Sequence, residues 1–294
     1  MALELTFLGT GTSAGVPMIG CDCPVCLSQD PRNKRDRSSV AVRYPRRPTS
    51  SDRKNSLPDQ MTVMIDASPE VRHQSIKHGV DWLDTLFFTH AHADHVLGLD
   101  DLRRFNSVTD GPIEFYAEPE VIQAIRQMFS YIFKDKHHYD NAFVAKLIPL
   151  PIGPGQVTAV GEAQWTPIRL MHGRLPILGY RIDWNGRSIA YCTDCSTIPH
   201  ETLRELEGLD VLILDGLRER HHPTHMTIGR ACEFAEQISA KQTYLTHIAH
   251  DLSHQALCER LPERVEPAFD GLKLVLKADA FDIITTTSAP GERA

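Results

Sequence analysis

The chain of 294 residues lacks a long hydrophobic run, because no stretch approaches the ~18 apolar residues that a membrane helix needs. Its first residues show neither a basic segment nor a small-residue cleavage site, so we expect a cytoplasmic protein without a signal peptide. Positive charge is also scarce: 31 Lys and Arg face 38 Asp and Glu, and the net charge of −7 disfavours a general binder of nucleic acid or anionic membranes. Glycine follows no three-residue period and 41% of residues are hydrophobic, which excludes a collagen-like or disordered chain.

A disulfide framework is missing too. The seven cysteines are an odd number, and three of them, Cys21, Cys23 and Cys26, lie within six residues. Three thiolates at this spacing favour a metal site that needs a fourth ligand over a set of disulfides. An iron–sulfur site and an oxidised cysteine pair are the alternatives. The remaining cysteines, Cys192, Cys195, Cys232 and Cys258, have no paired spacing and are interpreted as buried free thiols.

Short apolar runs with β-propensity alternate with segments of helical spacing. We predict strands at Leu3–Leu8, Val40–Tyr44, Met61–Ile65, Thr85–Phe88, Ile113–Tyr116, Ile189–Tyr191, Val211–Leu214 and Thr243–Leu245. Helices are predicted from Pro69, capped by Ser68, to His78, and over Pro119–Phe129 and Ile228–Ile238. This mixture predicts one layered α/β domain over residues 1–285, with a flexible insertion loop at 45–60 and a disordered tail at 286–294.

The sequence is rich in histidine, with 15 in all, and its densest group follows directly on an apolar strand. This group is His90-Ala91-His92-Ala93-Asp94-His95, a pattern expected by chance roughly 0.003 times in a chain of this composition. Sheet proteins gather their ligands where strands run out into loops, and imidazole and carboxylate in this density suit Zn, Mn or Fe. The sequence therefore predicts a metal site with room for two ions.

These residues resemble the signature of the metallo-β-lactamase fold, and the other motifs of that family follow in order. The resemblance implies a four-layer αββα sandwich, with Asp66 orienting a ligand. It also implies that His90, His92 and His172 hold one divalent ion, that Asp94, His95 and His247 hold the other, and that Asp194 bridges them. Each of Asp66, His172, Asp194 and His247 follows an apolar run.

A narrower likeness lies in the loop Gly9–Pro17, the three cysteines and the string Leu245-Thr246-His247-Ile248-Ala249-His250. Together they resemble the phosphoribosyl 1,2-cyclic phosphate phosphodiesterases of phosphonate degradation. The resemblance implies that Cys21, Cys23, Cys26 and His250 bind a structural zinc ion. The glycine loop does not match a dinucleotide fingerprint, because three residues separate Gly11 from Gly15.

A proton donor is predicted in the segment His221–Thr227, just before a helix. By the same resemblance, His225 protonates the leaving alkoxide or holds the phosphate, and imidazole has a suitable pKa for this role. The alternative is that Thr224 or Thr227 caps the helix and His225 only lines it. His137 and His138 are interpreted as part of a solvated turn.

The sequence thus predicts a hydrolase with two catalytic Mn²⁺ or Zn²⁺ ions and one structural Zn²⁺ ion. It would hydrolyse a small cyclic phosphodiester through a metal-bridging hydroxide, with His225 and Asp94 as catalytic residues. A small molecule rather than nucleic acid is the expected partner, and a homodimer is the common default. Two alternatives stay open: an RNA-processing nuclease of the same fold, and a non-catalytic zinc-binding accessory protein. A β-lactamase or thioesterase is disfavoured, because Asp194 stands where metallo-β-lactamases usually place a cysteine.

Overall fold

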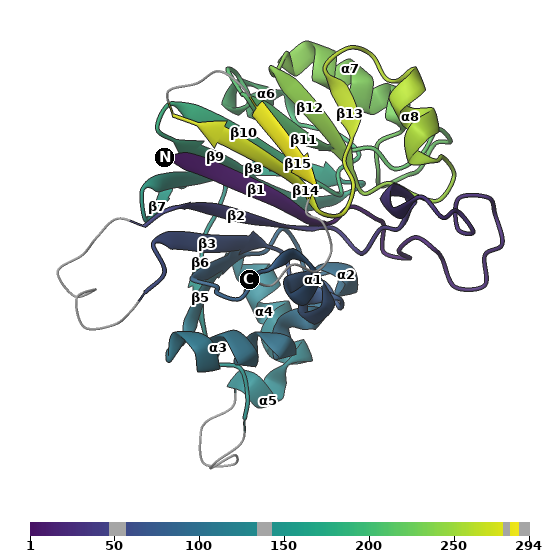
Figure 1. Cartoon of the computed structure of the whole chain (residues 1–294). Coiled ribbons are helices and arrows are strands. Elements are labelled where there is room, and N and C mark those ends of the chain that lie inside the picture. Colours follow the sequence, from purple (N-terminus) through teal and green to yellow (C-terminus); the bar gives the residue numbers. More distant parts are fainter. Residues whose placement is uncertain (47–56, 134–142, 279–282, 288–294) are drawn as a thin grey trace.

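A computed structural model of the chain describes residues 1–46, 57–133, 143–278 and 283–287. The described strands form two mixed sheets that lie face to face (Figure 1). The first sheet has the order β15 (Ile283–Thr287), β14 (Leu272–Lys277), β1 (Ala2–Gly9), β2 (Ser39–Pro45), β3 (Gln60–Ile65), β4 (Thr85–Phe87), β5 (Ile113–Ala117) and β6 (Leu147–Pro151). The second has the order β13 (Val265–Pro267), β12 (Gln242–Thr246), β11 (Val211–Asp215), β10 (Arg187–Cys192), β9 (Leu175–Trp184), β8 (Ala163–His172) and β7 (Thr158–Val160).

Helices cover the outer face of each sheet (Figure 1). On the first sheet lie α1 (Val71–His78), α2 (Ala93–Val96), a 3-10 helix (Leu97–Leu102), α3 (Arg103–Thr109), α4 (Pro119–Met128) and α5 (Ser130–Phe133). On the second lie α6 (His200–Glu205), α7 (Ile228–Ile238) and α8 (His254–Arg260), and a further 3-10 helix (Pro31–Asn33) precedes β2. No helix within the described ranges is long and apolar enough to cross a bilayer.

Three buried apolar clusters separate four layers. The central cluster packs the inner faces of the sheets together through large side chains such as Phe87, Trp165 and Tyr180. A second lies between the second sheet and α7, and a third between the first sheet and α1 and α4. Strands such as β11, buried on both faces, are therefore continuous apolar runs rather than alternating ones. The predicted αββα sandwich is confirmed.

Every predicted strand forms, and two predicted boundaries are wrong. The first helix begins at Val71 rather than Pro69, and the Ser68 hydroxyl accepts from the backbone N–H of Glu70 in the turn before it. Thr286 and Thr287, placed in the disordered tail, belong to β15 and pair with Lys273 and Leu272. β15 is held by its pairing with β14, which is close to it in sequence, and its own residue pattern did not identify it as a strand.

The predicted insertion joins two neighbouring strands, because β2 ends at Pro45 and β3 begins at Gln60. Its central part, 47–56, lies outside the described residues, as do His137, His138 and the tail from 288 onward. Flexibility of the insertion and the organisation of the chain as a single domain stay predictions.

Candidate metal centre

The predicted site residues gather at the carboxyl ends of strands from both sheets. Asp66 follows β3, His90 follows β4, His172 ends β8, Asp194 follows β10 and His247 follows β12. Neighbouring strands β3 and β4 run parallel, as do β10, β11 and β12, so these ends meet at one edge of the sandwich.

Three of these residues have a left-handed backbone. The φ angles are 64° at Asp66, 56° at Asp194 and 58° at His247. Such a conformation is uncommon for residues other than glycine and costs conformational energy, and it concentrates at functional sites where the fold enforces it. Here it turns each side chain from the end of its strand toward a common centre.

The first ligand cluster consists of His90, His92 and His172. One donor atom from each lies within 4.8 Å of the others. The ring centroids of His90 and His92 are 4.5 Å apart, and those of His92 and His172 are 5.1 Å apart. Three imidazoles with converging nitrogens form a ligand set that suits Zn.

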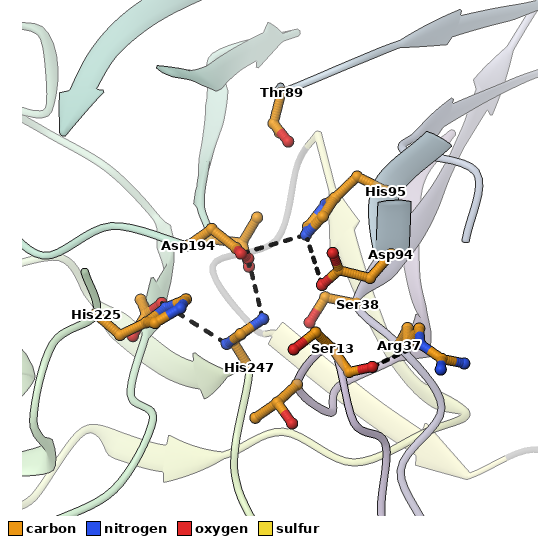
Figure 2. Close-up of polar contacts among 12 residues, drawn as sticks. Ser13, Arg37, Ser38, Thr89, Asp94, His95, Asp194, His225 and His247 are labelled. Carbon is orange, nitrogen blue, oxygen red and sulfur yellow. Dashed lines mark hydrogen bonds and ion pairs between the residues drawn. The ribbon is translucent and has the colours of Figure 1, made fainter. Parts of the chain in front are cut away.

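The second cluster consists of Asp94, His95 and His247 around Asp194 (Figure 2). Asp194 Oδ2 lies 3.3 Å from His95 Nε2, and Oδ1 lies 3.3 Å from His247 Nε2. The same Oδ2 is 3.9 Å from His90 Nε2, so the Asp194 carboxylate stands between the two clusters. His95 Nε2 also lies 3.4 Å from Asp94 Oδ2.

Five ring nitrogens at this centre are buried without a hydrogen-bond partner among the described residues. They are His90 Nε2, His95 Nε2, His172 Nδ1, and Nδ1 and Nε2 of His247. Each unpaired buried nitrogen costs about 1–3 kcal/mol, and native structures seldom leave several together. Their chemistry and convergence fit divalent metal ions, which would satisfy them.

The charge balance of the site favours ionised carboxylates. Burial raises the pKa of Asp194, but the neighbouring His247 and His95 outweigh it and hold that pKa well below its usual range. Burial likewise works against ionisation of Asp94, and its contact with His95 outweighs this and lowers the pKa. Both side chains are therefore available as anionic ligands at neutral pH.

Asp66 orients the centre from behind, as predicted. Its Oδ2 lies 2.7 Å from His95 Nδ1 and accepts a 2.9 Å hydrogen bond from the Thr89 hydroxyl. Its Oδ1 accepts from the Thr89 backbone N–H at 2.9 Å. With Nδ1 held in this way, His95 can offer only Nε2 to a ligand.

His225 faces the metal centre and is paired with an acid that the sequence reasoning missed. Asp215, at the end of β11, is fully buried, and its Oδ2 lies 2.8 Å from His225 Nδ1. The ring of His225 lies 4.6 Å from those of His172 and His247. Asp215 carries the same signal as Asp66, an acid ending the apolar run Val211–Leu214, and could have been found from it.

The alternative interpretation of the segment His221–Thr227, that a threonine caps the helix and His225 only lines it, is right about the cap. Thr227 does cap α7, because its hydroxyl accepts from the Arg230 backbone N–H. His225 nevertheless does more than line the helix, since its imidazole is fixed between Asp215 and the histidine clusters.

The three cysteines and His250 lie together beside this centre. The Sγ atoms of Cys21 and Cys23 are each 3.3 Å from His250 Nδ1, and all four donor atoms, that of Cys26 included, lie within 4.8 Å of one another. Three thiols and one imidazole form a ligand set typical of structural zinc. The other cysteines are free, as expected, but only Cys192 and Cys195 are buried: Cys232 is half-buried and Cys258 is exposed, so their predicted burial is wrong.

The glycine-rich loop borders the centre because it packs tightly on the segment 35–37. A Cβ on Gly9 would lie 2.0 Å from the Arg37 carbonyl oxygen, and one on Gly11 would lie 2.8 Å from that of Arg35. Arg37 donates from Nε to the Ser13 carbonyl at 2.8 Å, which places Ser13 near Asp94 (Figure 2). The loop thus serves close backbone packing and not dinucleotide binding.

Comparison with known families agrees with this geometry. Residues 61–248 match the β-lactamase superfamily domain. The chain belongs to this superfamily. It is also 38% identical to a crystal structure described as a new diphosphatase from the PhnP family, with a TM-score of 0.81 over 94% of this chain and 98% of that one. The chain is therefore a metallo-β-lactamase-fold hydrolase similar to the PhnP family.

Two curated relatives extend the comparison. The chain is 36% identical over 276 residues to an octanoyltransferase of Porphyromonas gingivalis, and it spans about half (52%) of the length of that protein. It is 30% identical to ribonuclease Z of Crocosphaera subtropica over 185 residues. The matched region covers 61% of this chain and 47% of the relative.

Proposed function

We propose that the chain is a metal-dependent phosphodiesterase that hydrolyses a small cyclic phosphodiester resembling phosphoribosyl cyclic phosphate. The observation that supports this most strongly is the position of His225, which is not needed to complete either ligand cluster, is backed by Asp215, and has a donor atom within 4.8 Å of donor atoms of His172 and Asp194. A site that only binds zinc has no need of such a pair.

In this proposal His90, His92 and His172 would hold one ion, Asp94, His95 and His247 would hold the second, and the Asp194 carboxylate, which lies between the two clusters, would serve as a ligand for the pair. Manganese and zinc both suit these nitrogen and oxygen ligands. When bound, such a pair of divalent ions activates water and neutralises charge on the attacking and leaving oxygens of a phosphoryl group. Cys21, Cys23, Cys26 and His250 would hold a structural zinc ion.

His225 would supply the proton that a leaving alkoxide requires. If the Asp215–His225 pair shares two protons, Nε2 always carries one of them, whichever group holds the other. Burial raises the pKa of Asp215 well above its usual range but lowers the pKa of His225, so the second proton of the pair would rest on the Asp215 carboxyl group. The proton on Nε2 faces the phosphoryl group and can pass to the departing oxygen.

An RNA-processing nuclease is the second candidate function, because a ribonuclease Z is 30% identical over 61% of the chain. Against it stands the net charge of −7, since a nuclease acting on a long polyanion is expected to present a basic surface. The likeness to a diphosphatase raises an organic diphosphate as a third substrate class. A departing phosphate leaves without a proton more easily than an alkoxide does, so the diphosphate makes less use of His225.

Turnover by the Mn²⁺-loaded and Zn²⁺-loaded protein tests the proposal. The substrates are a ribose 1,2-cyclic phosphate, an organic diphosphate and a precursor tRNA, each assayed with wild type and Asp194→Ala. We expect the cyclic phosphodiester to be hydrolysed fastest and the variant to be inactive on it. Preference for RNA or for the diphosphate would replace the proposed substrate, and no turnover of any of them would favour the accessory-protein alternative.

A further inference from the structure

A second histidine, His222, lies beside His225. The ring centroids of His222 and His225 are 5.0 Å apart with an angle of 50° between the planes. His222 is half-buried, and none of the groups of potential metal ligands in the described ranges includes it. His222 is therefore free for another task next to the proposed proton donor.

The hydrogen bonds of His222 determine which of its nitrogens carries the proton. The Thr224 backbone N–H donates to His222 Nδ1 at 3.4 Å, and the Thr224 hydroxyl lies 3.1 Å from the same atom. A backbone N–H can only donate, so Nδ1 is the acceptor and the proton of the neutral ring sits on Nε2. No acceptor for Nε2 is present in the part of the chain that the structure describes, which leaves this N–H for a ligand.

Surrounding groups keep the ring neutral. Burial lowers the pKa of His222, and the nearby His225 and Arg218 lower it further. Arg218 also stabilises the loop, because it donates to the carbonyl oxygens of Arg220 and His221 at 3.3 and 3.4 Å. His222 thus presents a hydrogen-bond donor rather than a positive charge.

The position of this loop is fixed by the turn between β8 and β9. Gly173, which follows the ligand His172, has φ of +64°, and a Cβ on it would lie 2.9 Å from Thr224 Cγ2 and 3.3 Å from the Pro223 carbonyl oxygen. The Gly173 N–H donates to the Ser196 hydroxyl at 3.0 Å. Close packing of Gly173 against this loop therefore fixes the position of His222 relative to His172 and His225.

We propose that His222 determines substrate specificity by donating from Nε2 to an oxygen on the leaving group, next to the oxygen that His225 protonates. The substrate class this favours is a phosphodiester of a polyol or sugar, in which a carbon next to the one that bears the departing oxygen carries a hydroxyl group. This inference rests on the proposed phosphodiesterase function.

A matched pair of substrates tests it: glycerol 1,2-cyclic phosphate and propane-1,2-diol cyclic phosphate, which differ by one hydroxyl. We expect wild type to prefer the glycerol compound in kcat/KM by about tenfold, the effect of one well-placed hydrogen bond. His222→Ala should reduce this ratio to about one. His222→Gln should restore part of it, because the glutamine amide reaches the position of Nε2 with an N–H.

His221→Ala is the control, since His221 is exposed and its ring contacts none of the described residues of the site. Its kcat/KM for each of the two substrates should match wild type. Equal loss on both substrates in His222→Ala, or a wild type without preference, would overturn the assignment of His222 and leave the phosphodiesterase proposal standing. Failure of wild type to hydrolyse either compound would overturn both.

Discussion

Asp215 Oδ2 lies 2.8 Å from His225 Nδ1, and the Met226 backbone N–H donates to the other carboxylate oxygen at 3.2 Å. These two contacts fix the position of the His225 ring beside His247 (Figure 2), with its centroid 4.6 Å from those of the His172 and His247 rings. The pair joins the end of β11 to the loop before α7. The position of His225, the proposed proton donor, therefore depends on the second sheet and not on the metal ligands alone.

Replacing His225 by Ala should separate substrates by their leaving groups. We expect turnover of a cyclic alkyl phosphodiester to fall about 10²–10⁴-fold, whereas bis(p-nitrophenyl) phosphate, whose leaving group needs no proton, should lose far less. Asp215→Asn, which keeps the shape but not the charge, should change the same ratio in the same direction. Metal content is the control and should stay at the wild-type value; equal losses on both substrates would remove His225 as the acid.

Replacing Cys23 by Ser should affect stability before chemistry. We expect loss of one zinc ion and a drop of about 5–10 °C in Tm, equivalent to ~2–4 kcal/mol for a domain of this size. Cys258→Ser is the matched control, because Cys258 is exposed on α8 and lies outside the cluster. An unchanged zinc content in Cys23→Ser, measured by mass spectrometry of the metals, would contradict the structural site.

Cys23 should also be an unusually reactive thiol when zinc is absent. The backbone N–H of Cys26 and the ring of His250 lower its pKa to about 6, so its thiolate fraction rises as pH increases through 6. Burial instead raises the pKa of Cys258. Peptide mapping after brief iodoacetamide treatment of zinc-free protein should show a half-maximal rate at Cys23 near pH 6, and protection on adding zinc. A midpoint at the ordinary thiol value would refute the assigned environment.

Two glycine substitutions should change stability in opposite directions. A Cβ on Gly9 would meet the Arg37 carbonyl oxygen at 2.0 Å, so Gly9→Ala should cost several kcal/mol, about 2–4 by analogy with overpacked cores. Gly229 lies in α7 with nothing within 4 Å of its Cβ position, and alanine there should stabilise by about 0.5–1 kcal/mol. Urea unfolding followed by circular dichroism measures both; a tolerant Gly9 would contradict the tight packing of the loop.

Much of the site could be predicted because each ligand follows an apolar run that forms a strand. His90 follows Leu86–Phe88, and Asp194 follows Ile189–Cys192, so local sequence placed them at strand ends. The pairing of Cys23 with His250, 227 residues apart, came only from the family resemblance. Local patterns do not specify contacts across such distances.

Other features could not be predicted from the sequence, because they depend on how separate segments pack together. Asp215 lies just beyond the predicted strand Val211–Leu214 and was not singled out, because its partner His225 lies ten residues away across a loop. The role of Gly173 depends on its contact with Thr224, which no periodicity reveals. The start of α1 was misplaced because Ser68 caps a turn rather than the helix itself.

Titration with Mn²⁺ of protein that carries zinc in the cysteine site and no metal at the histidine clusters tests the central claim most directly, with hydrolysis of bis(p-nitrophenyl) phosphate as the readout. The account predicts that activity reaches its plateau at about two equivalents and that Asp194→Ala, which lacks the carboxylate between the clusters, shows none. A plateau at one equivalent, or an active Asp194→Ala, would contradict a phosphodiesterase centre built on two ions.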